Sequence, residues 1–377
     1  MVDIAAIEEA VGPLCSPFLQ RERERGTRVI GFFCSYVPEE VLNMTGWASY
    51  RMRATVSTGT EAADSYMGCF NCGYTRHCFE LGLKEEYRFI DGFVFASGCD
   101  HLRRLYDNWS FYLDPGFVHI LDVPHLREDI SLEWYADEIR NLHTTLARRL
   151  GVPADAESLW EAIKKTNRTR ALLRSIDELR RTGQPRLTGR EMLAISLFAS
   201  STPKHIVNPI LEELLGTLAS SERTLPRSYR AAVLLVGSHL DDPEFVDLIE
   251  ETGALVVADS FCCGLRDLAD PVPEDLDQDP YAALAARYLD RLSCPRMYAD
   301  FPRRLGKLLE MARTTGVDGV IVEHLAFCET WGVDSNMLVR SFRANGIPAL
   351  KLERDYRLSS IGQIRTRVQA FIESMGK

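Results

Sequence analysis

The chain has 377 residues, 46% hydrophobic and 26% charged, a balance typical of a globular protein and not of a disordered or fibrous one. Its formal net charge of -10, without a basic block, argues against nucleic acid or an anionic membrane as the main partner. The N-terminus carries acids where a signal peptide needs basic residues, and no apolar run approaches the ~20 residues of a membrane span, so we expect a cytoplasmic protein.

The first predicted unit is an α/β domain over residues 1–130, because strand-like apolar runs alternate there with helical patterns. Helical spacing then takes over, as in Leu132 and Tyr135, and predicts a helical insert over residues 131–228. A polar connector at 220–228 closes this insert. The strands expected in the first domain are 28–33, 89–96 and 117–122.

A second α/β domain is predicted over residues 229–377. Strands alternate there with helical patterns, which favours βαβ units and a parallel sheet. We therefore predict two doubly wound parallel-sheet domains, Rossmann- or flavodoxin-like, together with the helical insert. The strands expected in this domain are 231–237, 254–258, 319–323 and 347–352, and the helices 244–252, 280–292, 302–315 and 333–344.

The two α/β segments share a short pattern. Asp91-Gly92 begins an apolar run that leads to Cys99-Asp100, and Asp318-Gly319 begins one that leads to Cys328-Glu329. This internal similarity indicates two related domains. Ligands bind at the carboxyl ends of the strands in an open parallel sheet, so the cysteines that follow these runs are candidates for a site.

Ten cysteines are spread over both halves of the chain. A disulfide framework is not expected, because the cytosol keeps thiols reduced. Thiolates hold iron-sulfur clusters and zinc, whereas a cysteine can also simply pack in a core. Four strand-like runs lead to Cys34, Cys99, Cys262-Cys263 and Cys328. Packing explains Cys15, Cys34 and Cys78 at least as well as ligation.

Ligation is the favoured explanation for Cys72, Cys99 and Cys328, because each follows an element that would place it in a turn. A structural zinc site usually shows two CxxC pairs, but Cys69 and Cys72 form the one clear pair here. Ligands from distant segments instead suit a cluster in a cleft between domains. The additional metal-ligand candidates are Cys69, Cys262, Cys263 and Cys294, and packing is about as good an explanation for the last three.

Motifs spread over most of the chain resemble the 2-hydroxyacyl-CoA dehydratase and benzoyl-CoA reductase family, which includes the double-cubane cluster proteins. No single motif is decisive, but their order and spacing together are fairly specific. In chain order they include Cys34-Ser35-Tyr36-Val37-Pro38, Tyr87-Arg88-Phe89-Ile90-Asp91-Gly92, Gly98-Cys99-Asp100-His101, Ser260-Phe261-Cys262-Cys263-Gly264, Phe327-Cys328-Glu329 and Leu352-Glu353-Arg354-Asp355-Tyr356.

The resemblance implies an oxygen-sensitive 4Fe-4S cluster bound by Cys72, Cys99 and Cys328. It also implies a separate ATP-hydrolysing iron-sulfur activator that injects one low-potential electron, and a second similar subunit. In keeping with this, the chain has no G-x-x-x-x-G-K-[ST] loop of its own. Dehydratases of the family use the electron to expel hydroxide from a 2-hydroxyacyl thioester, and the reductases use it to reduce an aromatic thioester.

Two other interpretations stay open. The chain has more cysteines than three ligands need, which raises the double-cubane subgroup, whose members are homodimers with eight irons in joined cubanes and reduce small molecules. Alternatively, the chain is a non-catalytic scaffold in which the cysteines hold zinc or pack.

Two polar residues after the first strand are candidates for catalysis. Ser35 and Glu39 lie where a side chain could meet substrate. The ordinary role is nevertheless the stronger explanation, because Pro38-Glu39-Glu40 is a common helix start with Pro and acids in its first turn.

Overall fold

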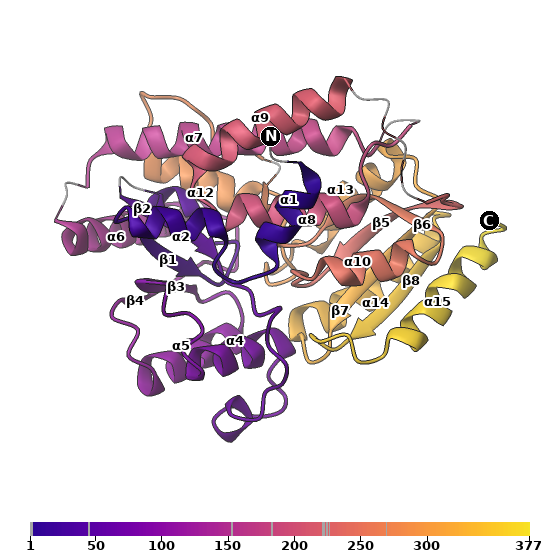
Figure 1. Cartoon of the computed structure of the whole chain (residues 1–377), viewed down its shortest axis with the longest axis horizontal. Helices are drawn as coiled ribbons and strands as arrows, with labels where there is room; N and C mark the ends of the chain where they lie inside the picture. Colours follow the sequence, from indigo (N-terminus) through magenta and orange to yellow (C-terminus); the bar gives the residue numbers. More distant parts are fainter. Residues whose placement is uncertain are drawn as a thin grey trace.

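Two parallel β-sheets form the centre of the molecule (Figure 1). The computed structural model describes residues 3–43, 46–151, 154–181, 184–220, 223, 225, 227–268 and 270–377. The first sheet has the order β2-β1-β3-β4 and the second the order β6-β5-β7-β8. The first sheet comprises β1 (Arg28–Phe32), β2 (Trp47–Arg51), β3 (Gly92–Ala96) and β4 (Val118–Leu121), and the second comprises β5 (Ala231–Gly237), β6 (Ala254–Ser260), β7 (Gly319–Leu325) and β8 (Ala349–Arg354).

The two sheets repeat one topology, since the first strand of each lies between the second and the third. All the strand pairs are parallel. This is the doubly wound arrangement that was predicted, and its ligand-binding position is the switch point between the first and third strands. The loops after β1 and β3, and those after β5 and β7, are therefore where a site is expected.

The internal similarity seen in the sequence has a structural counterpart. The carboxylate of Asp91 accepts a hydrogen bond of 2.8 Å from the backbone N–H of Val29. Asp318 makes the same bond, also 2.8 Å, to the N–H of Ala232. Each aspartate therefore ties the start of its sheet's third strand to the start of the first strand.

Strand β5 shows how helices cover both faces of a sheet. Val233 and Leu235 belong to a core with residues of α10 (Pro243–Glu250) and α15 (Ile361–Ser374), whereas Leu234 and Val236 belong to a core with residues of α13 (Phe301–Thr314) and α14 (Glu329–Ala344). A strand buried on both faces is apolar at every position, which is why this run was readable in the sequence.

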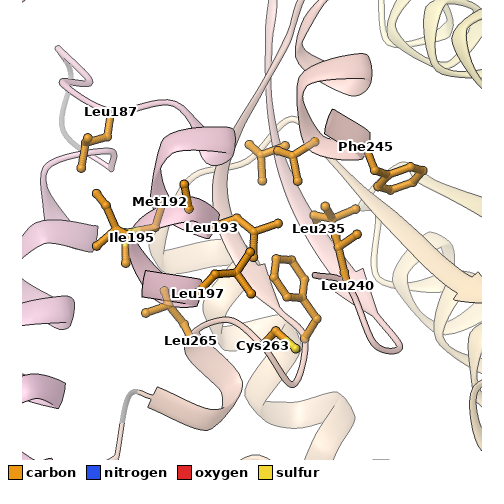
Figure 2. Packing of buried hydrophobic residues seen from close by; sticks show 14 of the residues in the cluster. Leu187, Met192, Leu193, Ile195, Leu197, Leu235, Leu240, Phe245, Cys263 and Leu265 are labelled. Carbon is orange, nitrogen blue, oxygen red and sulfur yellow. The ribbon is translucent and has the colours of Figure 1, made fainter. Parts of the chain in front are cut away.

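Helices α1 (Ile4–Val11) and α8 (Gly189–Ser200) join the first of these cores. Figure 2 shows Leu193 and Leu197 of α8 in the same cluster as Leu235 of β5 and Cys263. The N-terminal helix thus packs with the second sheet, and α12 (Pro280–Asp290) packs with the core of the first sheet. The chain crosses between its two halves more than once.

The remaining helices lie around the sheets and in the predicted insert. They are α2 (Pro17–Glu24), α3 (Glu39–Leu42), the 3-10 helix η1 (Ala63–Ser65), α4 (Gly73–Leu83), α5 (Asp100–Tyr112), α6 (Asp129–Leu150), α7 (Ala156–Glu178), α9 (Lys204–Ser220) and α11 (Leu265–Leu268). Across the described part of the chain, every helix is too short or too polar to cross a membrane.

The structure contains one strand that was not predicted, and part of the predicted connector lies outside the described residues. Strand β2 was not predicted, because Ser49 and Arg51 break its apolar run although both are buried. Much of the connector predicted at 220–228 falls on residues 221, 222, 224 and 226, which lie outside the described residues. The domain boundaries stay a prediction.

Candidate metal centre

A cavity of about 100 Å³ lies where the carboxyl ends of the two sheets meet. Its walls include residues that follow β1, β3, β5 and β7, the four strands that border the two switch points. The end of β2, the start of α4, the loop after β6 and the segment between α12 (Pro280–Asp290) and α13 (Phe301–Thr314) also contribute. The structure thereby brings together the three favoured ligand candidates and three further cysteines. The cysteines in its walls are Cys34, Cys72, Cys99, Cys262, Cys294 and Cys328.

The three favoured cysteines share one local geometry. Cys72, Cys99 and Cys328 are the N-cap residues of α4, α5 and α14, and their backbones are extended. None of the three thiols makes a capping hydrogen bond to its own helix. A helix N-terminus carries partial positive charge, so all three positions favour a bound anion or thiolate.

Burial controls the protonation of these thiols. It raises the pKa of Cys72, raises that of Cys99 well above the ordinary value, and raises that of Cys328 to about 12. In each case the backbone N–H three residues after the cysteine opposes this increase in pKa. These N–H groups belong to Thr75 for Cys72, Leu102 for Cys99 and Trp331 for Cys328. The raised pKa values favour the protonated thiols, and ligation of a metal would have to displace these protons.

Three buried arginines in the cavity wall have no acidic partner. Arg51, Arg266 and Arg296 are each at most 6% exposed, and none forms an ion pair with a carboxylate of the described residues. Arg266 and Arg296 donate to backbone carbonyls. The Nε and Nη1 of Arg51 have no partner in the described structure. Because burying an unpaired charge is costly, the cavity fits an anionic occupant.

A second group of thiols lies beside this cavity. The Nδ1 of His239 is 3.7 Å from Cys262 Sγ and 3.5 Å from Cys263 Sγ. The Cys263 thiol and His239 hold the pKa of Cys262 well below its ordinary value, against the effect of burial. Burial raises the pKa of Cys263 well above the ordinary value. Burial would lower the pKa of His239, but the carboxylate of Asp241 raises it overall. The contact between Cys262 and His239 thus lowers the pKa of the thiol and raises that of the imidazole.

Cys69 stands apart from the other ligand candidates. It is exposed and is absent from the cavity wall, although Cys72 is only three residues away. The neighbouring Phe70 packs edge-to-face with Phe327 at 5.8 Å, which brings the Cys72 and Cys328 loops together. Phe327 has a φ of 64°, a left-handed conformation that is strained for this residue.

The two polar candidates after β1 have different surroundings. Ser35 lines the cavity, and its Oγ accepts a 3.0 Å hydrogen bond from Arg291. Glu39 is absent from the cavity wall, and its carboxylate pairs with Lys204 Nζ at 2.8 Å. The structure thus brings Ser35, but not Glu39, to the cysteines. Their roles stay predictions.

Arg51 and His239 were missed by the sequence reasoning. His239 stands two residues after β5, as Cys34 stands two residues after β1, so matching the two repeats would have found it. Arg51 gave no such signal, because it ends the strand β2 that was itself not predicted.

The chain matches known proteins over most of its length. The family model described as 2-hydroxyglutaryl-CoA dehydratase, D-component, matches residues 34–375. The chain is 27% identical over 364 residues to YjiM of Escherichia coli, a provisionally named dehydratase subunit, with 94% of this chain and 93% of that protein covered. It is 25% identical to one of the subunits of benzoyl-CoA reductase of Thauera aromatica, covering 94% and 92%. It is 24% identical to the β subunit of (R)-2-hydroxyglutaryl-CoA dehydratase of Acidaminococcus fermentans, covering 98% and 99%.

Proposed function

Because the chain belongs to the 2-hydroxyglutaryl-CoA dehydratase D-component family, and is thus an enzyme subunit of the dehydratase and reductase type, we propose that it carries an iron-sulfur cluster. It receives low-potential electrons from an ATP-dependent activator. Its substrate is a 2-hydroxyacyl-CoA or a related CoA thioester.

One observation carries this proposal: three N-cap thiols from both halves of the chain converge on a cavity lined by buried arginines that pair with no carboxylate of the described residues. Cys72, Cys99 and Cys328 would hold a 4Fe-4S cluster. The cluster and its thiolates are together anionic, so the unsatisfied N–H groups of Arg51 and the three helix N-termini fit this group. When bound, the cluster supplies one-electron reduction at an iron without a protein thiolate.

The chain's own residues would bind and orient the substrate at this cavity. The hydroxyl of Ser35 is held by Arg291 and remains able to donate its proton to a substrate oxygen. The free N–H groups of Arg51 can hold a thioester carbonyl or a hydroxyl oxygen. Most residues of the cavity wall are buried, which strengthens each of these contacts relative to bulk water.

Two partners follow from the proposal. The sequence has no phosphate-binding G-x-x-x-x-G-K-[ST] loop, so ATP would be hydrolysed by a separate activator. The relatives are themselves named as subunits of a dehydratase and of a reductase, which implies enzymes built from several polypeptides. We propose that this chain pairs with a second, similar subunit, identical or different.

A second candidate is a homodimeric double-cubane protein that reduces small molecules. The observation that favours it is the number of thiols at the cavity, since three cysteines line it in addition to the proposed ligands. The additional cysteines are Cys34, Cys262 and Cys294.

Iron and acid-labile sulfide per chain, measured on protein purified without oxygen, test the proposal. About four of each supports a single cubane, and about eight irons supports the double-cubane candidate. A chain that binds no iron after anaerobic reconstitution would overturn both, and one zinc in a colourless protein would support a scaffold.

A further inference from the structure

We propose that His239, Cys262 and Cys263 form a separate metal site for one thiophilic divalent cation, Zn²⁺ or Fe²⁺. The inference goes beyond the proposed function and does not depend on it. It concerns three donors outside the Cys72, Cys99 and Cys328 set.

The donor atoms already lie at metal-binding spacing. The His239 Nδ1 and the two Sγ atoms are all within 4.8 Å of one another. The two nitrogen–sulfur distances are 3.5 and 3.7 Å. Tetrahedral zinc with its usual bond lengths to nitrogen and sulfur places such atoms about 3.6 Å apart. One ion would therefore fit between the donors with little rearrangement.

The histidine is oriented as a ligand. Its Nε2 lies 3.1 Å from the Asp241 carboxylate, and Asp241 in turn accepts a 2.6 Å hydrogen bond from the Tyr356 hydroxyl. The imidazole also stacks on the ring of Tyr74, with 3.7 Å between the centroids. A carboxylate on one ring nitrogen leaves the other free to bind metal, which is the usual support for a ligating histidine.

The three donors come from one half of the molecule. His239 follows β5, and Cys262 and Cys263 follow β6, whereas Cys72 and Cys99 belong to the segments around the first sheet. Cys263 is 3% exposed and is absent from the cavity wall. The site is adjacent to the proposed cluster cavity and touches it through His239 and Cys262, which both line that cavity.

Charge balance is simple at this site. A divalent cation displaces two protons from the group formed by the two thiols and the His239 imidazole, so the complex of two thiolates and a neutral imidazole carries no net charge. Arg51 Nη2 lies 3.5 Å from Cys262 Sγ and keeps that sulfur in contact with positive charge. Metal binding changes no oxidation state.

Cobalt titration of the full-length chain tests the site. The protein is first stripped with a chelator under anaerobic conditions, and Cys72→Ser with Cys99→Ser is used as background so that the other cysteine set cannot bind. We expect one Co²⁺ per chain, with thiolate-to-cobalt charge-transfer absorption that added Zn²⁺ abolishes. His239→Gln or Cys263→Ser in this background should remove the absorption.

Two further variants keep the test decisive if the ligand variants fold poorly. Asp241→Asn should retain the absorption but weaken Co²⁺ affinity about 10- to 100-fold. Cys78→Ser, at a buried thiol outside the cavity wall, should change neither. Absorption that survives His239→Gln would overturn the site. Iron bound at these three residues together with acid-labile sulfide would also overturn the site, because it would show that they bind a cluster and not a single ion.

Discussion

The guanidinium of Arg51 lies 3.5 Å from the thiol of Cys262, and no carboxylate of the described residues pairs with it. A buried arginine normally faces an acid, because an unpaired buried charge is costly. Here the nearest candidates for negative charge are sulfur atoms. The positive charge of Arg51 thus favours thiolates in the cavity, or an anionic group that thiolates bind.

Replacing Arg51 by Gln should make the reduction potential of a bound cluster more negative, on the order of tens of millivolts, because a nearby positive charge stabilises the reduced form. Arg51→Lys keeps the charge and should shift the potential less. A redox titration followed by electron paramagnetic resonance gives both values. Equal potentials in the wild type and the Gln variant would show that Arg51 does not act on the cluster.

Changing Cys72, Cys99 or Cys328 to Ser should each lower iron per chain after anaerobic reconstitution to a small fraction of the wild-type value, because a hydroxyl is a poor ligand for this cluster. Cys78→Ser is the matched control, since Cys78 is fully buried but is absent from the cavity wall. Iron and sulfide assays give the result. Full iron in any of the three ligand variants would exclude that cysteine as a ligand.

Gly73→Ala should weaken cluster retention without touching a ligand. A Cβ at Gly73, the residue after Cys72, would lie 2.6 Å from the Cβ of Tyr356, so the start of α4 must move. Gly216→Ala in α9 meets nothing within 4 Å and should stabilise the fold by about 0.5–1 kcal/mol. Melting temperature and iron content measured on both variants separate the two effects. Unchanged iron in Gly73→Ala would show that the helix start tolerates the shift.

Glu40→Gln should destabilise the fold by about 3 kcal/mol, because it leaves the buried guanidinium of Arg170 without its charge partner. The two groups lie 2.6 Å apart, and their side chains are 0% and 2% exposed. The pair of Arg168 on α7 and Glu212 on α9 is about half exposed, so Glu212→Gln should cost less than about 1 kcal/mol. Urea unfolding measures both, and similar losses in the two variants would contradict the argument.

Stability should fall as pH drops from 6.5 toward 4 because of His77. Burial, and then Arg357 and Arg76, lower the pKa of His77 from 6.5 to about 4. In this window the unfolded chain binds a proton that the folded chain does not, so the free energy of unfolding decreases as pH falls. The loss is on the order of 1 to 2 kcal/mol after a discount for solvent screening.

His77→Gln removes this titration and should flatten the pH dependence of the urea midpoint between pH 6.5 and 5. The Nδ1 of His77 lies 2.8 Å from Ser57 Oγ, a contact that the amide can replace. The slope, and not the absolute stability, is the readout. An identical slope in the wild type and the variant would assign the pH dependence to other groups.

Most of the fold was predictable, because strands buried on both faces are continuous apolar runs. Strand β5 was predicted at its observed bounds, and β1 within one residue. Strand β2 escaped because Ser49 and Arg51 interrupt its pattern, and their burial is decided by partners far away in the sequence.

The candidate site was predictable only in part. Cysteines at strand ends can be found from the alternation of strands and helices, and the structure does bring Cys72, Cys99 and Cys328 to one cavity. The ion pair that engages Glu39 could not be foreseen, since Lys204 lies on a distant helix. No motif around His239 marks it as a site residue, and only an alignment of the two repeats places it opposite Cys34.

The position of Cys328 near the end of the chain has a consequence for biosynthesis. Its two companions, Cys72 and Cys99, belong to the segments around the first sheet, which are made long before it. A group that needs all three thiols cannot be fully bound until Cys328 has been synthesised and the second sheet has formed. Cofactor loading would therefore follow the formation of both sheets, rather than guide the folding of the first.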